Sequence, residues 1–185
     1  MENEHFKNIN FTGQPLPGAE FDNCTFTNCD FSITSLSGIN FYECIFEECN
    51  LSNARLEKAG LKDVKFRQCK LLGLDFSQCQ PFMLQLAFTD CQLNLASFYQ
   101  LKLKGTHFKN CQLQETDFGN CDLTGAVFDH CDLAGAMFEN TILEKADLRN
   151  AFHFTIDPEL NYIKQAKFSS TGLAGLLGRY DLEIE

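Results

Sequence analysis

The stretch Cys111–Phe138, CQLQETDFGNCDLTGAVFDHCDLAGAMF, repeats every five residues. An apolar Leu or Phe recurs at Leu113, Phe118, Leu123, Phe128, Leu133 and Phe138, and a Cys, Thr or Ala stands two positions before each of them. A period of five fits neither an α-helix nor an ordinary strand, whose side chains recur every 3.6 and every two residues. The stretch therefore predicts a repeat architecture, and the fold depends on how far the repeat extends.

The same spacing runs through most of the chain. Fourteen repeats have centres from Phe11 to Phe76, the register slips by two residues around Gln80-Pro81-Phe82, and fourteen more have centres from Met83 to Leu148. Proline cannot donate to a β-ladder, so we interpret the slip at 80–83 as a bulge or loop at a corner. The alternative interpretation is that Phe82 protrudes there as a contact for a partner.

Composition limits the class of protein. A chain of 185 residues fits one domain, and a hydrophobic content of 44% is enough for a core. The chain contains 19 Phe and no Trp, as one packing position that accepts Phe would produce. The sequence has no apolar run that could span a bilayer and no signal peptide, so we expect a cytoplasmic protein without a membrane partner.

These repeats share one unit: a small residue, a polar residue, a central Leu or Phe, and two further polar residues. The chain resembles the pentapeptide repeat family over roughly residues 6–153. The resemblance implies an all-β fold, a right-handed quadrilateral parallel β-helix with one pentapeptide per side. It has about seven coils, and at about 4.8 Å per coil it stands about 34 Å tall. We divide the chain into this β-helix, 1–153, and a small C-terminal α/β cap, 154–185.

Stacking the sequence by 20 residues per coil, and by 22 across the slip, brings like residues together. One predicted column holds Phe26, Phe46, Phe66, Phe88, Phe108 and Phe128. The ten cysteines all occupy the small position, and six of them share a column: Cys29, Cys49, Cys69, Cys91, Cys111 and Cys131. Side chains stacked on successive coils are too far apart for a disulfide, and one line of thiols lacks the convergent geometry that zinc needs. We expect buried, reduced cysteines and no metal.

The tail after Leu148 loses the repeat. A helix is predicted to start at Ile156–Glu159, with Pro158 in its first turn, and a short strand at 165–169. Thr171 is predicted to cap a second helix, and a final strand is predicted at 181–185. The second helix carries four apolar residues at helical spacing: Leu173, Leu176, Leu177 and Tyr180. The quinolone-resistance subgroup, which the architecture resembles, joins two β-helices through such segments. We therefore expect a homodimer through these four residues, with a monomeric cap as the alternative.

Charge divides unevenly along the chain. Residues 110–144 hold no Lys or Arg and seven acids, which we take as the candidate partner-binding surface: Glu115, Asp117, Asp122, Asp129, Asp132, Glu139 and Glu144. These residues occupy about 8 Å of rod, a length over which duplex DNA carries about five charges. Residues 55–70 form a basic band instead: Arg55, Lys58, Lys62, Lys65, Arg67 and Lys70.

No nucleophile motif, phosphate loop or paired acid site is present, so we expect neither an enzyme nor a cofactor. The resemblance implies an acidic DNA mimic that binds DNA gyrase or topoisomerase IV, not nucleic acid itself, and that gives quinolone resistance. The long projecting loops of quinolone-resistance members are missing here, so any activity that depends on them is not expected. The alternative is a general interaction scaffold with an unrelated protein partner.

Overall fold

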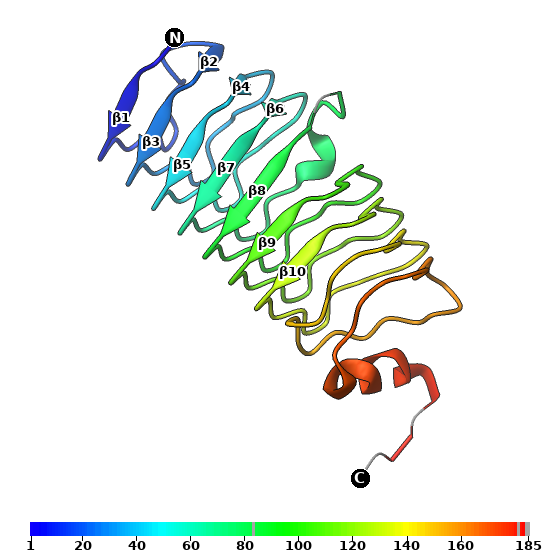
Figure 1. The fold of residues 1–185 in the computed structure, drawn as a ribbon. Coiled ribbons are helices and arrows are strands. Elements are labelled where there is room, and N and C mark those ends of the chain that lie inside the picture. Colours follow the sequence, from blue (N-terminus) through cyan, green and yellow to red (C-terminus); the bar gives the residue numbers. More distant parts are fainter. Residues whose placement is uncertain (83, 181, 184–185) are drawn as a thin grey trace.

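The computed structural model describes residues 1–82, 84–180 and 182–183 and shows a parallel β-solenoid (Figure 1). Its largest sheet has seven parallel strands, one from each successive coil. The strands are, in spatial order, β1 (His5–Lys7), β3 (Thr25–Thr27), β5 (Ile45–Glu47), β7 (Val64–Arg67), β8 (Leu86–Thr89), β9 (His107–Lys109) and β10 (Val127–Asp129). A second sheet holds β2 (Glu20–Asp22), β4 (Asn40–Tyr42) and β6 (Gly60–Lys62).

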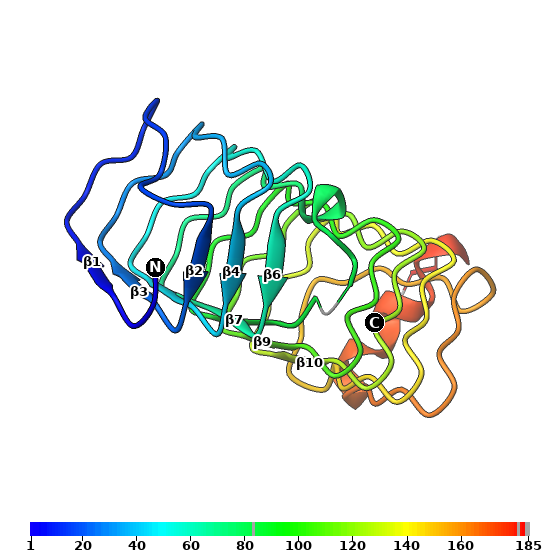
Figure 2. The ribbon, with the colours of Figure 1, turned by 90° about the horizontal axis from the view of Figure 1, so that it is seen from above.

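We number the four walls of the solenoid by one coil. The first wall is centred on Phe26 and carries the seven-stranded sheet; the second, third and fourth walls are centred on Phe31, Leu36 and Phe41. The three-stranded sheet lies on the fourth wall, beside the first (Figure 2). On the second and third walls, successive coils are joined by isolated bridges: Asn50↔Lys70 is an example on the second wall and Ser97↔Asp117 on the third. The predicted all-β parallel β-helix is confirmed.

Stacked rings fill the interior. Phe26 and Phe46 lie with ring centroids 4.8 Å apart and planes at 11°, and the rings of Phe88 and Phe108 are 5.1 Å apart at 4°. Rings on opposite walls meet edge to face across the interior, as Phe98 of the third wall and Phe108 of the first wall do at 78°. Both arrangements suit the ring quadrupole, and burial of each Phe stabilises the fold by about 1.5–3 kcal/mol. The predicted columns are confirmed.

The corners depend on a second repeated device. The second residue after a repeat centre commonly has positive φ, for example Asn28 at 50° and Asn120 at 55°. The residue before a centre is often Asp or Asn, whose side chain accepts a hydrogen bond from the backbone N–H two residues later, as Asp30 does from Ser32 at 2.9 Å. Asn50 makes the same bond to Ser52 at 3.1 Å. A carboxylate at this position therefore has a structural partner before any other protein binds.

The slip in register lies where the sequence predicts it. Phe66 pairs with Phe88, an offset that includes the two extra residues. A 3₁₀ turn, η1 (Phe76–Gln78), precedes the extra residues, and the side chain of Leu84 is buried after them. The predicted centre Met83 lies outside the described residues.

The coil contacts continue beyond residue 153. Isolated parallel bridges join Ile142 to Tyr162 and Asp147 to Lys167, so these parts of the tail lie in register on the preceding coil. The strand predicted at 165–169 is reduced to the single bridge at Lys167. A domain boundary at 153 remains a prediction.

The cap differs from its prediction. The helix predicted at Ile156–Glu159 is wrong: residues 158–160 form a turn, because Asp157 takes its corner role and accepts from the Glu159 N–H at 2.8 Å. The second helix is 3₁₀ rather than α. It comprises η2 (Ser170–Leu176), capped by Ser169 instead of Thr171, and η3 (Gly178–Tyr180).

The last predicted element falls at the end of the chain. Of the strand predicted at 181–185, residues 181, 184 and 185 lie outside the described residues, and 182–183 form no strand. None of the helices that the structure describes is long and apolar enough to cross a membrane.

Candidate interaction surface

The seven candidate acids do not share a wall. Asp129 is in β10 on the first wall, Asp132 and Glu115 belong to the second wall and its corner, Asp117 and Glu139 lie on the third, and Asp122 and Glu144 on the fourth. Residues 110–144 wind around the rod, so their acids form a belt instead of a patch. The charge on each wall is therefore set by the side chains of several stacked coils together.

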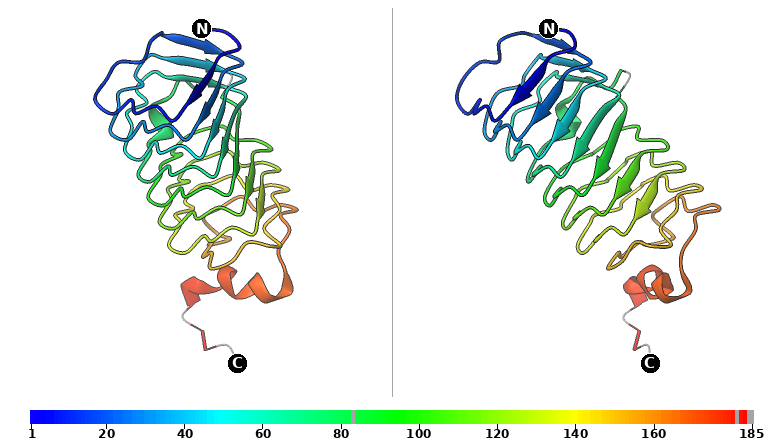
Figure 3. Two further views of the ribbon diagram at one scale, coloured as in Figure 1. Left: turned by 90° about the vertical axis from the view of Figure 1, so that its left-hand side faces the viewer. Right: turned by 60° about the vertical axis from the view of Figure 1, so that its left-hand side comes forward.

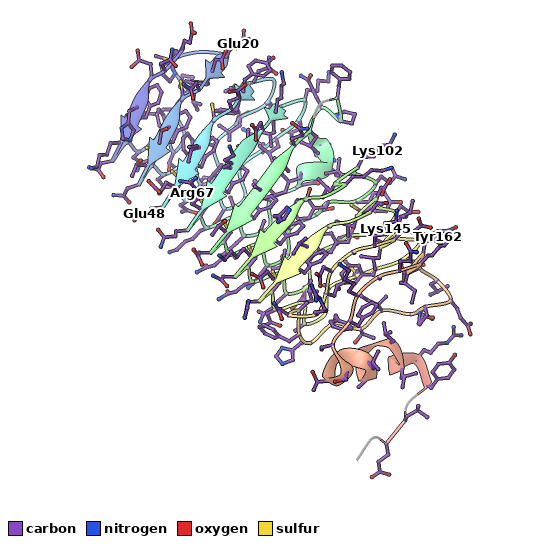
Figure 4. All side chains as sticks on the ribbon, viewed as in Figure 1. Glu20, Glu48, Arg67, Lys102, Lys145 and Tyr162 are labelled. Carbon is purple, nitrogen blue, oxygen red and sulfur yellow. The ribbon has the colours of Figure 1, made fainter. Side chains whose placement is uncertain are left out.

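The fourth wall carries lysines from adjacent coils. The Lys104 ammonium lies 3.2 Å from the Asp122 carboxylate. The backbone of Lys102 forms a parallel β-bridge with that of Asp122 on the next coil. Figure 4 shows Lys102 and Lys145 on one edge of the rod. Burial raises the pKa of Asp122, but hydrogen bonds from Thr124 and Lys104 outweigh it, and the net pKa is lowered. Asp122 is therefore compensated by lysine, whereas Glu144 on the same wall forms no ion pair among the described residues.

Histidine and amide side chains interact with Asp129 on the first wall and Asp132 on the second. Asp129 accepts from the Asn150 amide at 2.8 Å and lies 2.8 Å from Nδ1 of His130. Asp132 accepts from the Gln114 amide at 2.7 Å and lies 2.9 Å from Nδ1 of His153. Both carboxylates thus form local side-chain networks across coils.

The third wall is different. Bridges align Asp75, Ser97, Asp117 and Met137 in one column, and the wall carries no Lys or Arg in residues 74–78, 96–100, 116–120, 136–140 or 156–160. Farther toward the C-terminal end, Asp157 and Glu159 are paired with Arg179 at 3.0 and 2.6 Å. We name Asp117 and Glu139, together with Glu115 at the corner between the second and third walls, the third-wall acids. Among the described residues these three carboxylates form no ion pair.

Two exposed apolar side chains lie among the third-wall acids. Met137 is 53% exposed next to Asp117 in the column, and Tyr99 is 41% exposed. Gly119 leaves room for the Tyr99 ring, since a Cβ at that position would lie 3.3 Å from it. Tyr99 and Met137 were not among the partner-binding residues predicted from the sequence, although stacking by 20 residues places both beside the acids.

The C-terminal end of the rod is partly apolar. Leu173, Leu177 and Tyr180 are exposed, as the predicted dimer interface requires. The fourth predicted residue, Leu176, is instead half-buried against the core. Tyr162 at 60% and Leu160 at 50% exposure add to this end and were not selected from the sequence.

Phe82 is 77% exposed, the highest value among the exposed large apolar side chains that the structure describes. The chain leaves the ladder after Gln80, whose N–H donates to the Ala59 carbonyl, and rejoins it at Gln85, whose N–H donates to the Leu61 carbonyl. Both interpretations of the slip agree with this geometry, and a contact role for Phe82 remains a prediction.

All ten cysteines are buried, and six of them form the predicted column. The Cys29 N–H donates to Sγ of Cys49 at 3.4 Å, and Sγ of Cys69 donates to the Phe46 carbonyl at 3.3 Å. Burial raises the pKa of the Cys44 thiol to about 11 and that of Cys79 to about 12. These neutral thiols serve as small core residues.

A solenoid with these columns, corners and bare polar walls is a repeat scaffold whose surface is available for binding. The chain belongs to the pentapeptide repeat family: the model described as "Pentapeptide repeat region" matches residues 19–84 and 82–148. No curated protein gives a significant sequence match.

Several solved structures are similar to this chain. A trypsin-treated form of QnrB1, described as a plasmid-mediated fluoroquinolone resistance protein, is 23% identical, with 100% of this chain and 99% of that chain covered and a TM-score of 0.46. HetL, described as a pentapeptide repeat protein involved in heterocyst differentiation regulation from the cyanobacterium Nostoc sp. strain PCC 7120, is 21% identical, with 90% and 86% covered and a TM-score of 0.37.

Proposed function

We propose that this protein is a non-enzymatic, cytoplasmic protein-binding rod that acts as an acidic mimic of DNA. In this proposal it occupies the positively charged DNA-binding surface of DNA gyrase or topoisomerase IV, and thereby protects the enzyme from quinolones. The family membership supports a binding scaffold. The choice of partner rests on the acidity of one wall and on the likeness of the sequence to the quinolone-resistance subgroup.

The third-wall acids carry the proposal. Glu115 and Asp117 lie on one coil and Glu139 on the next. Two coils occupy about 10 Å of rod, a length over which each strand of duplex DNA carries about three charges. The density on this wall therefore matches one strand of a duplex locally. Asp122 on the fourth wall does not contribute to this match, because Lys102 and Lys104 lie beside it.

The apolar end supports a dimer. Leu173, Leu177, Tyr180 and Tyr162 are exposed there, and a polar rod gains most from burying such side chains against a second copy. A twofold dimer through this end would bring two copies of the third-wall acids toward the centre of a rod about 70 Å long.

A general protein-interaction scaffold remains the second candidate. It is favoured by Tyr99 and Met137, since exposed apolar side chains between acids suit a protein surface better than they imitate phosphates. The two candidates differ in partner, not in the wall used.

Gyrase supercoiling with and without a quinolone tests the proposal. The wild type should protect supercoiling from the drug, and the variant Glu115→Gln, Asp117→Asn, Glu139→Gln should not, with the difference shrinking in high salt. Asparagine keeps the corner bond that Asp117 accepts from Gly119 at 2.8 Å, as Asn50 shows. The matched control, Asp122→Asn with Glu144→Gln, should protect like wild type. If the third-wall variant protected gyrase as well as wild type, the DNA-mimic proposal would be contradicted. If wild type had no effect on gyrase, the general interaction scaffold would be the remaining candidate function.

A further inference from the structure

The third wall opens at the N-terminal end of the rod. In the next coil, the Leu36 N–H donates to the Arg55 carbonyl at 2.8 Å and the Arg55 N–H donates to the Thr34 carbonyl at 2.9 Å. Within the described residues 1–82, the equivalent bonds, from the Leu16 N–H to the Ser35 carbonyl and from the Ser35 N–H to the Gln14 carbonyl, do not form, and no bridge joins residue 15 to Ser35. The loop between β1 and β2 bows away from the coil below it (Figure 3).

Two prolines lie at the opening. Pro15 and Pro17 flank the repeat centre Leu16, where later coils carry residues such as Arg55 and Glu57. Each proline fixes its own φ and disfavours helical dihedrals in the residue before it. The turn that the Ile39 N–H closes on the Leu36 carbonyl at 3.1 Å in the next coil is not closed between Ala19 and Leu16 in this part of the described chain.

The opening leaves a row of backbone groups without partners. In the bridge Ser35↔Arg55 the bonds use the N–H and C=O of Arg55, so those of Ser35 point away, toward the first coil. The carbonyl of Ser37 also lacks a partner. On the next coil the equivalent carbonyl, that of Glu57, accepts a hydrogen bond from the Gly38 N–H at 2.9 Å, but no backbone N–H of the described chain donates to Ser37. One donor and two acceptors along an edge are what a parallel strand pairs with.

Side chains complete a groove beside this edge. The cavity measures about 600 Å³ and is bounded by Pro15, Leu16 and Ile39 on one side and by Ser35 and Ser37 on the other. Of the described residues that line it, Arg55 alone is charged. The volume is in the range of sites that hold small ligands or short peptides, and the charge favours a carboxylate.

We propose that this groove binds an extended peptide segment of a partner protein, which pairs in parallel with Ser35 and fills the missing side of the first coil. The peptide places an apolar side chain against Leu16 and Ile39, and an acidic residue opposite Ser35, within reach of the long Arg55 side chain. Main-chain bonds supply the docking and the carboxylate supplies the preference. This site is separate from the third-wall acids and does not rest on the proposed function.

The probe is the acetylated, amidated peptide Ala-Asp-Leu-Ser-Gly, which imitates a regular repeat. Titration into isotope-labelled protein, followed by amide NMR, should shift the signals of Ser35, Ser37 and Arg55 saturably in the millimolar range and slow hydrogen exchange at the Ser35 amide. The matched peptide with Lys in place of Asp should bind at least severalfold more weakly, because it faces Arg55. Absence of saturable shifts at Ser35, or equal binding of the two peptides, would overturn the proposal.

Two variants separate the site from general effects. Ser35→Pro removes the open donor without touching the bonds of Arg55, and it should raise Kd about tenfold. Replacing both prolines, Pro15→Asp with Pro17→Ser, should let the first coil close on Ser35 and abolish peptide binding. If either substitution fails to fold, the amide spectrum shows it and the two-peptide comparison decides. Unchanged binding after closure of the loop would place the peptide elsewhere and refute the groove.

Discussion

Nζ of Lys104 lies 3.2 Å from Oδ2 of Asp122, although the two residues belong to different coils. Residues 110–144 contain no Lys or Arg, so charge counted along the sequence makes Asp122 part of an uncompensated acidic segment. Stacking brings a lysine of the preceding coil beside it. On this scaffold the relevant charge is that of a wall, and the third-wall acids form no ion pair among the described residues.

Thiol chemistry tests the interior. At pH 8 none of the ten cysteines should react rapidly with a thiol reagent in the folded protein, and all ten should react after denaturation. Burial keeps the reagent out and raises the pKa of thiols such as Cys44 to about 11, so the reactive thiolate is scarce. Intact mass before and after reduction checks for disulfides. Several fast-reacting thiols in native protein, or a mass gain on reduction, would contradict this prediction.

Substitutions at the C-terminal end test the dimer. Leu173→Glu with Leu177→Glu should convert a dimer into a monomer in light scattering at micromolar concentration, because both side chains are exposed on the proposed interface. Leu95→Glu is a matched control, since Leu95 is 62% exposed on another part of the rod. Leu176 is a poor choice for this test because it packs against the core. A monomeric wild type would remove the dimer from the proposal.

Two phenylalanines with opposite environments test the packing. Phe98→Ala should lower the free energy of unfolding by about 3–5 kcal/mol, since the ring is fully buried and stacks 4.7 Å from Phe76. Phe82→Ala should change it by less than about 0.5 kcal/mol, because the side chain is 77% exposed. Chemical denaturation measures both. A large loss at Phe82 would show that the loop is part of the core.

Acid should destabilise the C-terminal coils through Asp132. Partial burial raises the pKa of this carboxyl, but hydrogen bonds from Gln114 and His153 outweigh it and lower the pKa in the folded protein. Its contribution is therefore present above the unfolded pKa of about 3.9 and is lost as pH falls below it. Asp132→Asn should reduce the fall in melting temperature between pH 6 and pH 3. Glu115→Gln, at an exposed carboxylate without a hydrogen bond among the described residues, is the control; equal slopes in both variants would refute the assignment.

Much of the fold follows from local sequence. The five-residue period places Phe98 and Phe118 inward and fixes their stacking, because each repeat must bury its own central residue on the coil below. The same reasoning places the cysteines in the small position and the extra residues at 80–82. These features depend only on position within the repeat.

The functional surface depends on more. Column arithmetic brings Tyr99 and Met137 near Asp117, but their exposure depends on how neighbouring side chains pack. The opening beside Ser35 results from a backbone departure that the repeat pattern conceals, because Leu16 still occupies a regular centre. Period and composition give no account of either feature.

The sequence by itself determined the solenoid, its register and its inward residues, because a strict period leaves one way to stack the coils. The tertiary structure decided which charges meet across coils and how the tail closes the rod. The tail has no period, and its helices are placed by contact with Phe154: Gly172 fits there because a Cβ would lie 3.0 Å from that ring. This contact holds η2 with Leu176 toward the core and leaves Leu173 and Leu177 exposed. Which face of η2 packs against the rod depends on the surface of the last coil. The spacing of apolar residues in the tail does not encode that surface.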